Sequence, residues 1–223
     1  MEDKTMETNA NAANGCRFLL VASDVHDSEA CFSKLARKAS DPDCIAFLYA
    51  GDLNVENYFI CEELKYRSFT FLPVLGNCDN PWAWTDAGVQ QPPQFRTLHQ
   101  RNRTGELGIY MSHGHRYPQP SYAGLDDDAF ALIITGHSHV GCIETCRPKK
   151  LETSHMDGNE KECTAVHLNP GSPSSPRGGS SPSYAVIRIP DEGSAVVELR
   201  EFFSDDLLST AAIPLHKVEE GHD

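Results

Sequence analysis

The segment "ITGHSHV" at residues 134–140 places two histidines one residue apart, directly after the apolar run "FALIIT". Because imidazole is polar, His137 and His139 do not extend the buried strand that this run predicts. From a loop, two imidazoles at positions i and i+2 can converge on one point, which is a geometry that metal ions use. Surface loops also carry histidines, so this segment alone leaves a solvent-facing role open.

Four other short segments place metal-type donors directly after apolar runs. They are "SDVHD" with Asp24 and His26, "GDL" with Asp52, "GNCD" with Asn77 and Asp79, and "SHGH" with His113 and His115. Glycine in most of these segments lets the backbone bring the side chains close to a shared centre. Imidazole, carboxylate and amide donors suit Mn, Fe, Ni, Co or Zn, and the lack of a thiolate pair argues against a structural zinc.

The elements that must position these donors alternate in the N-terminal half. Apolar runs within 17–23, 44–52 and 69–80 predict strands with polar tips, and helical spacing over 28–42 and 55–66 predicts helices between them. This order is typical of a parallel α/β sheet, in which ligands bind where the carboxyl ends of the strands converge. The polar tips are therefore expected to meet.

The pattern changes after residue 94. Residues 94–100 and 107–115 predict a hairpin with Gly105 in its turn, and residues 125–139 predict a helix end followed by a strand. Further strands are predicted within 162–172, 183–189 and 195–203, which makes this half antiparallel and rich in sheet. We expect an α/β fold of two packed mixed β-sheets flanked by helices.

Length and composition predict one soluble domain. The 223 residues are 39% hydrophobic and 23% charged, and no apolar run is long enough to cross a bilayer. We expect a disordered tail over 1–16, the domain over 17–206 and a C-terminal extension over 207–223. Two inserts are predicted as loops: the charged segment 147–162, and the segment 171–183, rich in Gly, Ser and Pro, which is expected to be flexible unless something binds it.

Charge and cysteine usage restrict the partners and the compartment. The net charge of -13 repels polyanions and predicts no extended nucleic-acid surface, although a local cation can still receive a small anion. The polar, acidic start shows no targeting signal, and the eight cysteines are scattered, several within apolar segments. These features predict reduced thiols and a cytoplasmic protein, and they carry no signal for the oligomeric state.

The ordered set Asp-x-His, Gly-Asp, Gly-Asn-x-Asp, His and Gly-His-x-His resembles the calcineurin-like metallophosphoesterase superfamily. "HGH", "NPGS" and Cys78 in place of a histidine in the third motif resemble its small single-domain phosphodiesterase branch. The resemblance covers about residues 17–203. It implies a metallophosphoesterase-type α/β sandwich that hydrolyses small phosphodiesters through a bridging hydroxide at a two-metal site.

Carried over by motif, the resemblance implies two divalent metal ions, with Mn the expected metal and Ni, Co, Fe, Zn or Mg as alternatives. The implied ligands are Asp24, His26 and His139 for one ion, Asn77, His113 and His137 for the other, and Asp52 as the bridge. The implied catalytic residues are Asp52, Asn77 and His115, and the implied substrate contacts are Asn77, His115 and Arg177. Two carboxylates among otherwise neutral ligands leave net positive charge on two divalent ions for a small phosphate ester.

Several neighbouring residues keep two interpretations. Asp27 and Asp79 either orient the histidines or form turns. His115 contacts substrate, donates a proton or faces solvent, and Arg177 is a phosphate clamp or a solvated loop residue. Asn169 and Gly171 in "NPGS" are also explained by turn chemistry. Trp82 and Trp84 either stack on a substrate ring or anchor the loop 80–93.

The cysteines and the function also leave alternatives open. Cys142, Cys146 and Cys163 with His155 invite a zinc interpretation, but their spacing does not fit a usual finger and free thiols are favoured. Cys78 occupies a position at which many superfamily members have a proton-donating histidine, so good leaving groups are expected to be favoured. The alternative functions are a phosphomonoesterase with the same site and a protein-interaction scaffold resembling the retromer subunit of this fold.

Overall fold

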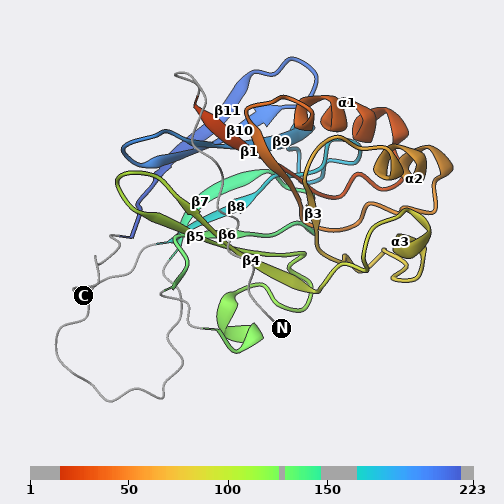
Figure 1. Ribbon diagram of the computed structural model, residues 1–223, viewed down its shortest axis with the longest axis horizontal. Helices are drawn as coiled ribbons and strands as arrows, with labels where there is room; N and C mark the ends of the chain where they lie inside the picture. The colour runs from red at the N-terminus through yellow and green to blue at the C-terminus, as the bar shows by residue number, and fades with distance from the viewer. Residues whose placement is uncertain (1–15, 126–128, 147–164, 217–223) are drawn as a thin grey trace.

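Two β-sheets packed face to face form the body of the protein (Figure 1). The computed structural model describes residues 16–125, 129–146 and 165–216. Helices α1 (Glu29–Ala39) and α2 (Tyr58–Lys65) cover the outer face of the larger sheet, where Figure 1 shows them side by side. The expected α/β fold of two mixed sheets flanked by helices is confirmed.

The larger sheet has six strands in the order β11-β10-β9-β1-β2-β3. The strands are β1 (Arg17–Ala22), β2 (Cys44–Tyr49), β3 (Phe71–Pro73), β9 (Ser183–Ile189), β10 (Ala195–Glu201) and β11 (Leu207–Ile213). β1, β2 and β3 run parallel, and the remaining pairs are antiparallel. The parallel strands are joined by α1 and α2, as the alternating sequence pattern predicts.

The smaller sheet has five strands in the order β4-β5-β6-β8-β7. The strands are β4 (Phe95–Arg101), β5 (Glu106–Ser112), β6 (Leu132–Ile134), β7 (Cys142–Cys146) and β8 (Ala165–Asn169). β4 and β5 form the predicted antiparallel hairpin, whereas β6 is parallel to both β5 and β8. The C-terminal half is therefore mixed and not simply antiparallel.

The core lies between the two sheets and continues under the helices. Leu19 and Leu48 of the larger sheet face Ile109 and Leu168 of the smaller one, and all four are fully buried. On the other side of the larger sheet, Phe47 packs against buried residues of α1 and α2. Because β1 and β2 are covered on both faces, their sequences are continuous apolar runs without alternation.

Local signals explain where the helices begin. α1 buries residues spaced along one face, including Phe32, Leu35 and Ala39, and it has Glu29 in its first turn. α2 begins after Asn57, whose side chain accepts hydrogen bonds from the N–H groups of Phe59 and Ile60. The sequence pattern predicted a start for this helix three residues before the observed one, because the apolar spacing extends back beyond the N-cap residue.

Some elements differ from the expectation. Strand β7, the short helix α3 (Ala83–Asp86) and the 3-10 helix η1 (Pro120–Ala123) had no clear sequence signal because they are short. Residue 129, shortly before β6, is in a 3-10 helix, in keeping with the expected helix end, while 126–128 and the whole of the 147–162 insert lie outside the described residues. Residues 207–213, which we assigned to an extension, pair with β10 as β11 and continue the larger sheet.

In the described part of the chain no helix is long and apolar enough to span a membrane.

Candidate metal centre

The polar tips of five strands meet at one end of the sandwich. Asp24 follows β1, Asp52 follows β2, Asn77 follows β3, His113 follows β5, and His137 and His139 follow β6. Several of these tips have a left-handed backbone, with positive φ at Asp24, His26, Asp52, His137 and His139. Non-glycine residues rarely adopt this conformation, and where they do they cluster at functional sites.

The first group of donors is formed by Asp24, His26 and His139, whose donor atoms lie within 4.8 Å of one another. The Nε2 atoms of His26 and His139 are 3.0 Å apart, and Asp24 Oδ1 lies 3.3 Å from Nε2 of His139. His139 Nδ1 donates to the carbonyl of Ser175 at 2.7 Å, which leaves Nε2 free for an ion. These separations are those of atoms that share one ion, since ligands of a tetrahedral zinc lie about 3.3 Å apart.

The second group of donors is formed by Asp24, Asp52 and His113. His113 Nδ1 donates to the carbonyl of Ala50 at 2.7 Å, and its Nε2 faces Asn77 Oδ1 at 3.1 Å. Asp52 Oδ2 lies 3.4 Å from Nε2 of His113 and 3.7 Å from Nε2 of His26. Asp52 therefore belongs to this group and also lies near His26 of the first group.

Burial and charge shift the pKa values of these groups. Burial raises the pKa of Asp24, although His113, Ser23 and His139 oppose it. For Asp52, burial also acts to raise the pKa, but the hydrogen bond and charge of His113 outweigh it and hold the pKa well below the ordinary range. Burial alone would lower the pKa of His113, yet Asp52 and Asp24 raise it. The carboxylates of Asp24 and Asp52 thus stabilise positive charge at the centre.

The donor set fits divalent metal ions. Asp24 Oδ1 is buried without a hydrogen-bond partner, and such an atom is costly unless a cation satisfies it. Its other oxygen, Oδ2, already accepts hydrogen bonds from Ser23 Oγ and from the N–H of His137. The unsatisfied oxygen therefore points toward His26 and His139, where an ion would complete its coordination.

His137 and His115 lie beside this centre in a ring cluster. The ring centroid of His113 is 5.2 Å from that of His137 and 5.3 Å from that of His115. Neither His137 nor His115 enters the donor groups within 4.8 Å among the described residues. His115 Nδ1 is buried without a hydrogen-bond partner, and burial, followed by the charge of His113, lowers the pKa of its imidazole.

The structure distinguishes between the two interpretations of Asp79 and Asp27. Asp79 Oδ2 accepts the N–H groups of Asp52 and Gly76, and Oδ1 accepts those of Leu53 and Asn54. Its role is thus to fix the Asp52 loop rather than to orient a histidine. Asp27 is exposed, and its carbonyl accepts a hydrogen bond from the side chain of Asn57.

Gly76 is needed at its position because the chain passes very close to Asp52. A Cβ added there would lie 1.9 Å from Asp52 Oδ1. Asp52 Oδ1 accepts the N–H of Cys78 at 2.8 Å in the same loop. The "GNCD" segment therefore packs directly on the carboxylate that follows β2.

The "NPGS" segment at residues 169–172 supports the histidine loop, the loop that carries His137 and His139. Turn chemistry alone did not predict this role. Asn169 Oδ1 accepts the N–H of Gly171, while its Nδ2 donates to the carbonyl of Gly136 and to Ser138 Oγ. Ser172 Oγ donates to the carbonyl of Asp24 at 2.7 Å. These bonds tie residues 169–172 to both donor loops, so a segment predicted to be flexible is fixed by its serines and asparagine.

Arg177 lies in the same segment, next to His139. Its N–H donates to the carbonyl of His139 at 3.2 Å, and its side chain is exposed. The guanidinium can therefore move toward the centre without breaking a described contact of its side chain.

The cysteine interpretation changes in the structure. No disulfide joins two of the described cysteines, while Cys163 and His155 lie outside the described residues. The three-cysteine zinc site therefore has no described geometry. Cys78 is exposed next to Asp52 and His26, and burial together with the Asp52 charge raises the pKa of its thiol to about 11.

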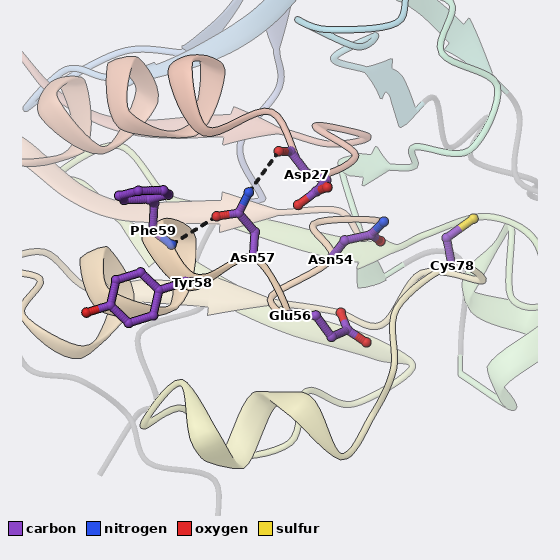
Figure 2. A pocket seen from close by; sticks show the side chains of 7 residues that line it. All are labelled: Asp27, Asn54, Glu56, Asn57, Tyr58, Phe59 and Cys78. Carbon is purple, nitrogen blue, oxygen red and sulfur yellow. Dashed lines mark hydrogen bonds between the residues drawn. The ribbon is translucent and has the colours of Figure 1, made fainter.

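A pocket of about 500 Å³ adjoins the centre at Cys78. The sequence pattern did not predict this pocket. Figure 2 shows the rings of Tyr58 and Phe59 at one end and Cys78 at the other, with Asn54 between them. Tyr58 and Phe59 are 68% and 58% exposed, which is unusual for adjacent aromatics at a helix start. Asp27, Glu56 and Asn57 complete the lining.

The two tryptophans of the loop 80–93 have different environments. Trp84 is fully buried and stacks on Phe71 with ring centroids 6.4 Å apart, so it anchors the loop to the domain. Trp82 is 80% exposed. Only Trp82 is free to contact a substrate ring.

Buried carboxylates and imidazoles at the carboxyl ends of strands in a two-sheet sandwich define a metal-dependent hydrolase. The calcineurin-like phosphoesterase superfamily domain matches residues 18–192. The chain belongs to this superfamily, which is metal-dependent, and the resemblance of its motifs is thereby confirmed. No curated protein matches the chain significantly.

Solved structures share the fold at low sequence identity. The phosphoesterase YfcE from E. coli aligns over 88% of this chain and 100% of its own, with a TM-score of 0.64 and 18% identity. A novel archaeal phosphodiesterase aligns over 88% and 99%, with a TM-score of 0.53 and 15% identity. GAP50, the anchor in the inner membrane complex of Plasmodium, aligns over 92% and 91%, with a TM-score of 0.55 and 14% identity.

Proposed function

We propose that this chain is a divalent-metal-dependent phosphodiesterase that hydrolyses small phosphodiesters at a two-metal site. The observation that carries the proposal is the position of Asp52 Oδ2 between Nε2 of His26 and Nε2 of His113. One carboxylate between two imidazole groups is the arrangement that two neighbouring ions require. Mn is the expected metal because oxygen and imidazole donors predominate.

The proposed ligand sets extend the two donor groups. Asp24, His26 and His139 would hold one ion, and His113 with its neighbours Asn77 and His137 would hold the other, with Asp52 shared. When bound, the ions would supply the nucleophilic water at neutral pH and neutralise charge on the phosphate. Their role would replace a protein nucleophile at the centre, since the Cys78 thiol, with its raised pKa, is a poor nucleophile.

Residues around the ions would position the phosphodiester. The Asn77 amide reaches the centre through Oδ1, and its Nδ2 lies 3.2 Å from Cys78 Sγ at the mouth of the pocket. His115, which is partly buried beside His113, would contact the phosphate or the leaving oxygen, and the exposed Arg177 would neutralise charge from the other side. Asn77, His115 and Arg177 are thus the proposed substrate contacts.

The pocket next to Cys78 would receive an organic part of the substrate. Its lining has two carboxylates, from Asp27 and Glu56, and no lysine or arginine. Such a lining disfavours a second phosphate group and suits a neutral ring or chain against Tyr58 and Phe59. This favours a small organic diester over a polyanion, in keeping with the net charge of -13.

The scaffold function is the second candidate, because GAP50 shows that this fold also forms an anchor. The two candidates differ in what the centre must do. A scaffold has no need for an unsatisfied buried Asp24 oxygen beside two imidazole Nε2 atoms 3.0 Å apart. These atoms favour the enzyme.

The test measures hydrolysis of bis-p-nitrophenyl phosphate and p-nitrophenyl phosphate by chelated protein before and after addition of Mn. We expect turnover only with metal and a higher kcat/KM for the diester. Activity that survives exhaustive chelation would contradict the metal site, and a higher kcat/KM for the monoester would indicate the phosphomonoesterase instead.

Thermal unfolding separates the enzyme from the scaffold. Mn at about 100 times its Kd should stabilise the parent by about 2.7 kcal/mol and His113→Ala much less. His99→Ala is the matched control, because His99 lies on β4 and contacts Glu106 away from the centre. Equal stabilisation of all three proteins would favour the scaffold.

A further inference from the structure

A second cluster of metal-type side chains lies on the outer face of the smaller sheet. The donor atoms of Cys142, Glu144 and His167 lie within 4.8 Å of one another. Their residues differ from every ligand proposed for the metal centre. Thiol, carboxylate and imidazole are all donors that zinc takes in proteins.

The sheet register explains why these side chains converge. Cys142 and Glu144 are two residues apart on β7, so they point to the same face. In the antiparallel pair of β7 and β8, Glu144 is directly opposite His167. Val166 and Leu168 of β8 face the core, which puts His167 on the outer face with the other two. The convergence is therefore fixed by backbone pairing.

The His167 ring is held in a defined orientation. Thr135 Oγ1 and His167 Nε2 form a hydrogen bond of 2.8 Å, which leaves Nδ1 for an ion. A bond through the other ring nitrogen is the ordinary support of a metal-ligating histidine.

The three residues open into a cavity of about 610 Å³. Glu144 is exposed and Cys142 and His167 are half-buried, so an ion can enter from solvent. The same cavity is also lined by Asn169, which is opposite Cys142 in the sheet, and by His137, so it reaches the loop that carries His137 and His139. A fourth coordination position at the cluster would therefore face a space large enough for a water or a small anion.

We propose that Cys142, Glu144 and His167 form a second metal site, selective for zinc over manganese, with three protein ligands and one open position. The thiolate selects zinc, a borderline-soft ion, while the proposed ligands of the metal centre are nitrogen and oxygen donors. The negative charges of thiolate and carboxylate balance the two charges of the ion. Binding requires that the Cys142 proton leave to solvent, so affinity rises with pH.

The experiment uses the full chain, stripped by chelation and titrated with Co²⁺ as a spectroscopic substitute for zinc. The parent should develop near-ultraviolet thiolate-to-cobalt charge-transfer absorption. Cys142→Ser should lose this absorption. Cys146→Ser and Cys78→Ser should keep it, because Cys146 is the matched control on the same strand and Cys78 is the cysteine near the metal centre. Elemental analysis after equal dialysis against zinc should find one fewer zinc ion per chain in Cys142→Ser.

Conservative variants keep the test decisive if Cys142→Ser folds poorly. His167→Gln and Glu144→Gln retain the thiol. Each should raise the Kd of Co²⁺, measured from the thiolate-to-cobalt absorption, by more than about 10-fold. Three results would overturn the site: no thiolate band in the parent, a band that persists in Cys142→Ser, or a band lost in Cys78→Ser but not in Cys142→Ser. None of these readouts depends on phosphodiester hydrolysis, so the proposed function and this site fail separately.

Discussion

The carboxylate of Asp79 accepts the backbone N–H of Asp52 at 2.9 Å, although the two residues are 27 positions apart. Three more N–H groups, from Leu53, Asn54 and Gly76, converge on the same carboxylate. Asp52 and Asn54 have positive φ angles, so their loop is in a conformation that is costly without support. Asp79 provides that support from the next strand tip.

We expect Asp79→Ala to lower the free energy of unfolding by about 3 kcal/mol, because it leaves several buried N–H groups without an acceptor. Urea unfolding with and without Mn measures the effect. The loss should be accompanied by weaker Mn binding, since Asp52 loses its fixed position. Asp86→Ala, on α3 in the same loop, is the control and should change the unfolding free energy by less than about 0.5 kcal/mol. Similar losses in both variants would contradict the role of Asp79.

Asp52→Asn should reduce kcat/KM for bis-p-nitrophenyl phosphate about 1000-fold in saturating Mn, whereas His115→Ala should reduce it about 10-fold. The reason is that Asp52 lies between both histidine groups, while His115 contacts the centre through the His113 ring. Steady-state kinetics of the two variants decide the order. Equal losses would mean that Asp52 does not bridge two ions.

Much of the fold and the donor set follows from local sequence signals. Apolar runs that end in Asp24, Asp52 and His113 predict strand tips, and parallel strands bring such tips together. The cap at Asn57 and the buried face of α1 are equally local. These features depend on residues within a few positions of one another, which a sequence pattern captures.

The contacts that fix the centre are long-range and could not be predicted. Ser172 donates to the carbonyl of Asp24 across 148 positions, and Asn169 holds the loop of Gly136 across 33. Which strand pairs with β7 decides that Glu144 lies opposite His167. The sequence pattern suggested a zinc site only through Cys142, Cys146, Cys163 and His155, with free thiols favoured. The group of Cys142 with Glu144 and His167 depends on pairing with β8, which the pattern did not predict.

The stability of the sheet should depend on Glu198 and on pH. Glu198 on β10 accepts hydrogen bonds from Arg188 and Arg200. Burial alone would raise the pKa of Glu198, but the two arginines lower it below the ordinary value of 4.5. A carboxylate whose pKa is lower in the folded state stabilises it above the unfolded pKa, and this contribution is lost as pH falls through the folded pKa.

Glu198→Gln should therefore be less stable than the parent by about 1 kcal/mol at pH 7, and the difference should disappear as the pH falls from 4.5 through the lowered pKa of Glu198. Urea unfolding at several pH values measures it. Glu192→Gln is the control, because its pair with Arg103 is exposed on both sides and should contribute little. A difference between Glu198→Gln and parent that is independent of pH would show that packing, not charge, is what the variant removes.

The last prediction concerns the leaving group and Cys78. Hydrolysis leaves negative charge on the departing oxygen, and an acid that protonates it typically contributes about 100- to 10,000-fold for a basic leaving group. Burial and the Asp52 carboxylate raise the pKa of the Cys78 thiol to about 11, so the thiol is a weak acid at neutral pH. Rates should fall steeply as the leaving-group pKa rises, with nitrophenyl esters far ahead of alkyl esters.

Cys78→His should flatten this dependence and raise turnover of alkyl esters more than of nitrophenyl esters, because imidazolium is a stronger acid than the thiol. Cys78→Ser is the matched control, with a side chain of similar size and no useful acid, and its dependence should be as steep as that of the parent. The measurement is kcat/KM across a series of diesters graded by leaving-group pKa. Parallel slopes for the parent and Cys78→His would place the proton donor elsewhere, with His115 the first candidate because its ring lies beside His113 at the same centre.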